Sequence, residues 1–132
     1  VWLFEELNLF FKPSRANLYQ AILFSLVHFR SDFDLVSNIQ LLVGLFILGL
    51  YLNSWRLMKK TTVLLPISFH GSLVGVWFLF TNSLMTINKN IPNLIFGPGE
   101  GINFNPVGGL IGIVILLLLY YFQKRYFLRI SF

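Results

Sequence analysis

Two histidines, His28 and His70, occur inside apolar segments whose lengths approach or reach that of a membrane-spanning helix. Because an ionisable side chain is costly in hydrocarbon, a histidine in such a segment is a candidate functional residue. Neutral imidazole is a common ligand for zinc and related divalent ions. We therefore interpret His28 and His70 as candidate catalytic residues and metal ligands, and we predict one zinc-like divalent ion and no other cofactor.

The composition predicts an integral membrane protein. Of the 132 residues, 56% are hydrophobic and 11% are charged, whereas a soluble domain carries about 25% charged residues. Such a chain cannot cover itself with polar surface, so its first expected partner is the lipid bilayer. The net charge of +5 is interpreted as a topology signal and as contact with anionic lipid, and we predict no nucleic-acid partner. The absence of cysteine excludes disulfides and thiolate metal sites.

The pattern of apolar segments predicts an all-α fold, a polytopic bundle of four transmembrane helices that forms one domain over 1–132. The apolar residues of 1–12 fall near one helical face, so we expect an amphipathic helix at the membrane interface, or the end of a span that begins upstream. Pro13 and Ser14 break the pattern after it. The spans are predicted at 16–29, 36–54, 62–84 and 107–123, and a long extracytoplasmic loop rich in Asn, Gly and Pro at 85–106. The first span is shorter than the roughly 20 residues that a crossing needs.

Basic residues indicate the orientation, because they favour the cytoplasmic ends of spans. With the start of the first span inside, Arg30 and Lys89 lie outside and every other basic residue lies inside: Lys12, Arg15, Arg56, Lys59, Lys60, Lys124, Arg125 and Arg129. We therefore predict that both termini are cytoplasmic, or on the equivalent stromal or matrix side. A bacterial plasma membrane and a thylakoid both fit.

The same topology places the two histidines at similar depth. At about 1.5 Å of rise per residue, His28 lies on the order of 17 Å from the inner end of its span. On the same count His70 lies roughly 13 Å from the inner end of the third span. Both imidazoles are therefore expected near the middle of the membrane, where they could share a site.

The residues around the histidines resemble a known family over about residues 1–80. Phe24 and His28 form an FxxxH pattern, and a glycine-containing segment, 49–52 (GLYL), leads to a second one, 65–71 (LPISFHG), which contains His70. This order resembles the CPBP family of intramembrane metalloproteases (the CAAX-protease, bacteriocin-processing or Abi family). The family pattern is EExxxR, then FxxxH, then HxxxN.

The sequence departs from this pattern in two places. Glu5 and Glu6 are followed at the arginine position by Phe10, and the family register places its glutamate pair just before Val1, so we expect the chain to begin after that motif. Val74 stands where the last motif has a polar residue.

The resemblance implies that a glutamate and the two histidines polarise a water, directly or through a metal, for attack on a peptide bond. Since a catalytic zinc normally takes three protein ligands, His28 and His70 alone imply an incomplete site. We therefore predict a CPBP-like protein related to intramembrane metalloproteases, with an incomplete active site in this chain. The alternative is a pseudo-enzyme that acts as a non-catalytic integral subunit or assembly factor and binds other membrane proteins in a larger complex.

Overall fold

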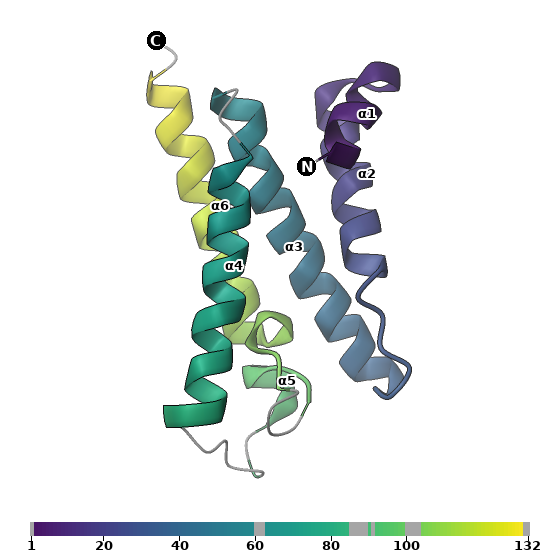
Figure 1. Cartoon of the computed structure of the whole chain (residues 1–132), viewed down its shortest axis with the longest axis vertical. Helices are drawn as coiled ribbons and strands as arrows, with labels where there is room; N and C mark the ends of the chain where they lie inside the picture. Colours follow the sequence, from purple (N-terminus) through teal and green to yellow (C-terminus); the bar gives the residue numbers. More distant parts are fainter. Residues whose placement is uncertain (1, 60–62, 85–89, 91, 100–103, 131–132) are drawn as a thin grey trace.

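The computed structural model describes residues 2–59, 63–84, 90, 92–99 and 104–130. All regular elements of these residues are helical, which confirms the all-α prediction. Figure 1 shows the long helices running roughly alongside one another. Their bounds are α1 Trp2–Phe10, α2 Pro13–Leu26, α3 Leu35–Lys59, α4 Leu64–Leu79, α5 Asn93–Phe96 and α6 Leu110–Ile130.

The helices differ at their ends from the predicted spans. The first predicted span, 16–29, corresponds to α2, which begins at Pro13 and ends at Leu26. Proline is favourable in the first turn of a helix, where its missing N–H is not needed for hydrogen bonding. The third span, 62–84, corresponds to α4 and a π-helical turn, Phe80–Leu84. Within the predicted loop, 85–106, residues 93–96 form α5, and residues 85–89, 91 and 100–103 lie outside the described residues. A 3₁₀ turn, Pro106–Gly108, occupies the start of the predicted fourth span, 107–123, whose helix α6 begins at Leu110.

Helix α3 is the centre of the bundle and contacts α2 on one side and α4 and α6 on the other (Figure 1). The buried core repeats along α3 at helical spacing and is completed by one residue of α6. Its members are Leu41, Leu45, Ile47, Leu48, Tyr51, Leu52 and Leu116. Residues three or four apart lie on one helix face, as Leu41, Leu45, Leu48 and Leu52 do. Ile47 and Tyr51 form a second, neighbouring face, so α3 packs on more than one side.

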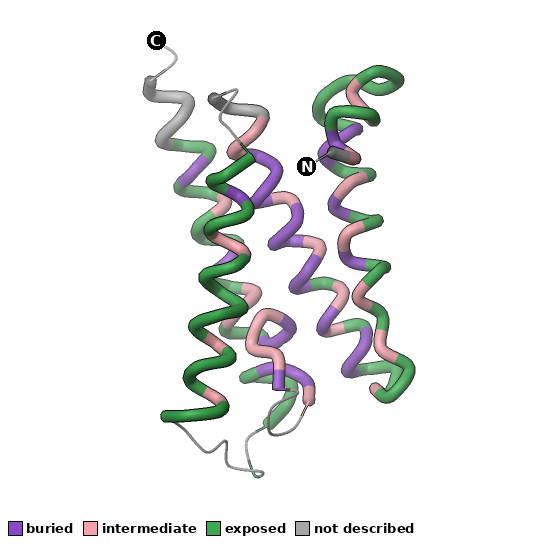
Figure 2. Tube along the Cα trace, viewed as in Figure 1, coloured by how far each residue is buried: buried purple, intermediate pink, exposed green. Residues whose placement is uncertain are grey.

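Helix α4 is apolar, but most of its residues are not covered by other helices. In Figure 2 most of α4 has the green colour of exposed residues. Among the described residues, two helical stretches are long and apolar enough to cross a membrane, Leu35–Arg56 and Leu64–Leu84. The first is 56% buried within its apolar window, whereas the second is 6% buried. Exposed apolar surface of this size is expected of a helix in contact with lipid or with another membrane segment.

Two buried polar contacts join the outer helices to α3 at one level. The Asn53 amide donates to Asn17 Oδ1 at 3.0 Å, which links α3 to α2. The Ser54 hydroxyl donates to Gln123 Oε1 at 2.6 Å, which links α3 to α6. Such contacts between membrane helices contribute on average about 0.6 kcal/mol each. They therefore fix the register of the helices more than they determine total stability.

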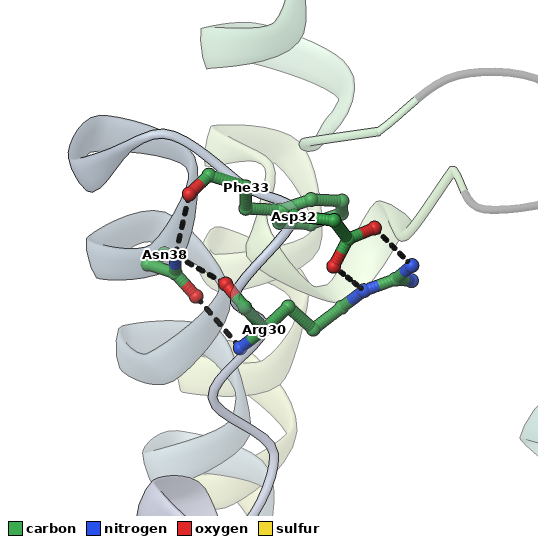
Figure 3. A network of polar contacts seen from close by, with 4 residues as sticks. All are labelled: Arg30, Asp32, Phe33 and Asn38. Atoms are coloured by element: carbon green, nitrogen blue, oxygen red, sulfur yellow. Dashed lines mark hydrogen bonds and ion pairs between the residues drawn. The ribbon is translucent and has the colours of Figure 1, made fainter.

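The turn between α2 and α3 is organised by Asn38, which is 2% exposed. Its amide nitrogen donates to the carbonyls of Arg30 at 2.8 Å and Phe33 at 3.0 Å. Its Oδ1 accepts from the Arg30 backbone N–H at 3.0 Å, and Arg30 also pairs with Asp32 (Figure 3). This network holds the chain where it leaves α2 and enters α3.

Asp34 caps the start of α3. Its carboxylate accepts from the Ser37 backbone N–H at 2.9 Å and from the Ser37 hydroxyl at 2.8 Å. These hydrogen bonds, the backbone one first, hold the pKa of the exposed Asp34 carboxyl below its usual value. The ionised carboxylate is therefore the form that the folded turn favours.

Replacing Asn38 should destabilise the turn. Asn38→Leu removes the acceptor of the Arg30 backbone N–H and the side-chain donor to the Phe33 carbonyl, so the free energy of unfolding should fall by about 1–3 kcal/mol. Denaturant unfolding in detergent micelles measures this loss. Asn82→Leu is the matched control, because the Asn82 amide bonds to the Phe78 carbonyl at an exposed position. An equal loss in both variants would contradict the role assigned to Asn38.

The Asp34 cap predicts an acid-sensitive turn. Because the folded state lowers the pKa of Asp34, the stabilisation is fully present above the unfolded pKa of about 3.9. It should be lost as the pH falls through the lower pKa of the folded state. Unfolding midpoints measured from about pH 5 downward should therefore decrease. Asp34→Asn should flatten this dependence, and an unchanged acid profile in that variant would be evidence against the cap.

Candidate functional site

His28 lies just after the C-terminus of α2 rather than within the helix. Helix α2 ends at Leu26, and the His28 backbone N–H donates to Ser25 O at 3.0 Å, which tightens the last turn. The His28 Nδ1 atom lies 2.7 Å from the Phe24 carbonyl oxygen. Carbonyls in the last helical turn lack intrahelical partners, and a histidine side chain can satisfy one of them. His28 therefore caps the helix whose length the sequence overestimates at this end.

This hydrogen bond determines the tautomer of His28. A carbonyl oxygen can only accept, so Nδ1 carries the proton and Nε2 retains its lone pair when the ring is neutral. A basic Nε2 is the form that serves as a general base or a metal ligand. In metal sites and catalytic sites the second ring nitrogen is commonly held by such a backbone carbonyl.

The Phe24 ring contacts both imidazoles. Its centroid lies 4.8 Å from that of His28, with an interplanar angle of 57°. The centroid of His70, which α4 contributes, lies 5.9 Å from that of Phe24 at 81°, an edge-to-face geometry. The fold thus brings His28, which follows α2, and His70 of α4 to one aromatic side chain. This residue is the first position of the FxxxH pattern.

A cavity of about 310 Å³ lies where α2, α3 and α4 meet. Phe24, Leu52 and Ile67 supply apolar walls, and the polar lining side chains are those of Gln20, Asn53 and His70. His28 is not among the lining residues, so the cavity approaches the pair from the His70 side. Gln20 Oε1 and His70 Nδ1 are buried and have no hydrogen-bond partner among the described residues.

Sequence reasoning missed Gln20 and Asn53. A signal was present, because each is an amide side chain within an apolar helix, and polar groups in such positions commonly face the interior of a bundle. The predicted site depends on histidines, carboxylates and motif spacing, none of which points to these amides. Only the cavity shows that two of them lie beside His70.

The described residues do not form a complete metal site. No group of three or more His, Asp or Glu side chains gathers in the part of the chain that the structure describes. A catalytic zinc takes three protein ligands, and the described site offers two imidazoles. The Glu5 carboxylate instead forms an ion pair with Arg56, with Arg56 Nε at 2.9 Å. The two imidazoles therefore do not by themselves fit a catalytic zinc.

Val74 does not supply the polar group expected four residues after His70. Its side chain is exposed on α4 and has no hydrogen-bonding atom. Ser68 and Ser72 are also exposed on this helix. The polar side chains that lie beside His70 among the described residues are therefore the amides of Gln20 and Asn53, on other helices.

Comparison with known proteins identifies the family. Residues 1–76 match the model of the family described as type II CAAX prenyl endopeptidase Rce1-like, a stretch that includes Phe24, His28 and His70. No curated protein and no solved structure matches the chain. The family is membrane-embedded, in agreement with the two apolar helical stretches. The chain belongs to the type II CAAX prenyl endopeptidase Rce1-like family and is a CAAX protease-like membrane protein.

Proposed function

We propose that this chain carries the histidine part of an intramembrane endopeptidase site that cleaves prenylated C-terminal peptides. The substrate class follows from the family description. The observation that carries the proposal is the contact of the Phe24 ring with both imidazoles. Aromatic packing of this kind orients the two rings, and a catalytic group must be oriented before it can accelerate a reaction.

His28 is the best placed proton acceptor among the described residues. Its Nε2 accepts a proton from a water whose oxygen attacks the scissile carbonyl carbon, and the resulting imidazolium returns the proton to the leaving amine. General acid–base catalysis of this kind contributes about 10²–10⁴-fold in rate. His70 lies across Phe24. Its ring can exchange a hydrogen bond with the same water in either direction, or donate one to the developing oxyanion. The family pattern assigns a glutamate to this step as well, so a carboxylate from outside the described residues would add to the two imidazoles.

The second candidate function is a non-catalytic subunit or assembly factor that retains this scaffold. Val74, exposed in place of the polar residue of the last motif, favours it. So does the 6% burial of the apolar window in the α4 segment, because an uncovered helix of this kind can pack against another membrane protein. A multi-subunit role predicts fixed partners that survive purification in a mild detergent.

We also propose that the chain termini face the cytoplasm or its stromal or matrix equivalent. In Figure 1 the end of α6 lies at the same end of the bundle as the end of α3 and the beginnings of α2 and α4. Basic residues belong to these segments, among them Lys12, Arg15, Arg56 and Lys124. Their gathering at one end supports the orientation that the positive-inside rule predicts.

Replacing either histidine should abolish cleavage if the site is catalytic. His28→Gln and His70→Gln should each lower turnover of a prenylated peptide in proteoliposomes by at least about 100-fold, because each removes an oriented imidazole. The experiment measures release of the C-terminal fragment. Ser72→Ala is the matched control, since Ser72 is exposed on α4 and should leave turnover unchanged.

The same assay separates the two candidate functions. Wild-type protein that cleaves no prenylated peptide, but is recovered with constant partner proteins, would contradict the peptidase proposal and support the subunit. Wild-type cleavage that persists in both glutamine variants would contradict the assignment of the histidines.

A further inference from the structure

Two ring contacts on neighbouring residues link α4 to α3 and to α2. The Phe69 ring contacts the Tyr51 ring of α3, with centroids 5.1 Å apart and an interplanar angle of 59°. The next residue, His70, contacts the Phe24 ring of α2 at 5.9 Å. Since successive side chains of a helix point about 100° apart, the two contacts face different neighbours. Together they determine the rotation of α4 about its own axis, which neither contact fixes alone.

Exposure to lipid does not select this rotation, because α4 is apolar on every side. Ile67, Leu73 and Leu79 are all exposed and lie six residues apart. They therefore point in directions about 120° apart around the helix axis. The hydrophobic effect does not drive one membrane helix onto another, since lipid tails are as apolar as the side chains. The rotation of α4 consequently depends on specific packing contacts.

The rest of α4 leaves the rotation at His70 to the Phe69 contact. A Cβ at Gly71 or at Gly75 would meet no atom of the other described helices within 4 Å, so no neighbouring backbone locks the helix there. A further contact holds the far end of α4, where Trp77 Nε1 donates to the Phe104 carbonyl at 2.8 Å. Trp77 lies about 10 Å along the axis from His70. It keeps α4 in the bundle without reaching the site.

Tyr51 is a fixed surface against which α4 can pack. It is 5% exposed and belongs to the buried core of α3. Trp55 lies edge-to-face against it, with centroids 6.2 Å apart and an interplanar angle of 83°. Phe69 packs on this core while remaining partly exposed. The centroid separations of both pairs lie within the range of about 4.5–7 Å that aromatic pairs favour.

We infer that Tyr51 is a positioning residue for His70. Tyr51 is not among the residues that line the cavity beside His70, so it acts through Phe69 rather than on the reacting atoms. By holding Phe69 it turns the adjacent His70 toward Phe24, the ring that also contacts His28. The use of this position in peptide hydrolysis rests on the proposed function, whereas the position itself does not.

Dipolar couplings between ¹⁹F and ¹⁵N test this role. With fluorophenylalanine at position 24 and ¹⁵N-labelled histidine in bilayers, the two ring signals are assigned with His28→Gln and His70→Gln. Tyr51→Leu should lose most of the coupling to His70 and keep the coupling to His28. Tyr51→Phe should retain both couplings, because it keeps the ring. An unchanged His70 coupling in Tyr51→Leu would overturn the inference, as would equal loss of both couplings.

A second variant keeps the test valid if Tyr51→Leu does not fold. Phe69→Leu removes the partly exposed side of the same contact and leaves the core residue in place, so it should also lose the His70 coupling alone. Two matched controls should retain both couplings. They are Phe78→Leu, at an exposed phenylalanine of α4, and Tyr120→Leu, at a tyrosine that packs on the same core from α6. Unchanged His70 coupling in folded Phe69→Leu protein, or the same loss in either control, would overturn the inference.

Turnover separates this inference from the proposed function. In proteoliposomes that cleave a prenylated peptide, Tyr51→Leu should lower turnover on the order of 10²-fold, the cost of misplacing a catalytic group by about 1 Å. Tyr51→Phe should restore it. Full turnover in a Tyr51→Leu protein would overturn the positioning role. Wild-type protein that cleaves no peptide would contradict the proposed function, and the couplings alone would then decide whether Tyr51 positions His70.

Discussion

The hydrogen bond from His28 Nδ1 to the Phe24 carbonyl, 2.7 Å long, is the interaction on which the site depends. It satisfies a carbonyl in the last turn of α2 and directs the imidazole back along the helix instead of into the following turn. The ring therefore lies against Phe24, where it meets the side of the site that α4 supplies. The same bond leaves Nε2 as the basic nitrogen. A capping contact that stabilises a helix end thus also prepares the ring for proton transfer.

The arrangement of apolar and polar side chains around this hydrogen bond follows from one constraint, namely that the protein is surrounded by lipid rather than by water. The chain places most of its apolar side chains outward, above all on α4, and a bilayer tolerates this where water would not. Polar groups are correspondingly drawn inward, as the Asn17–Asn53 and Ser54–Gln123 contacts show. Because lipid cannot satisfy a hydrogen bond, each inward polar group must find a partner in the protein or in trapped water. Gln20 Oε1 and His70 Nδ1, which belong to residues that line the cavity, are among the buried polar atoms of the described residues for which neither backbone nor side chain meets this requirement.

The fold class and the family could be predicted from the sequence, because both depend on the order and spacing of residues along the chain. Continuous apolar segments gave the helices, and the FxxxH spacing with His70 after Pro66 gave the resemblance that the family match confirms. The end of α2 at Leu26 was not predictable, because neither Gly nor Pro follows Val27 and His28. The hydrogen bond of the His28 ring to the Phe24 carbonyl closes the last turn, and Asn38 holds the chain that follows at Arg30 and Phe33. The cavity was not predictable either, because it forms where Gln20, Asn53 and His70 come together from three helices.

The account stands on the claim that His28 and His70 meet at the Phe24 ring. Fluorophenylalanine placed at position 24, in protein with ¹⁵N-labelled histidine reconstituted in bilayers, allows ¹⁹F–¹⁵N dipolar couplings to be measured by solid-state NMR. The ring contacts with Phe24 predict that the ring nitrogens of both histidines are coupled to the fluorine. Coupling to His28 alone would place His70 away from Phe24 and would contradict the shared site.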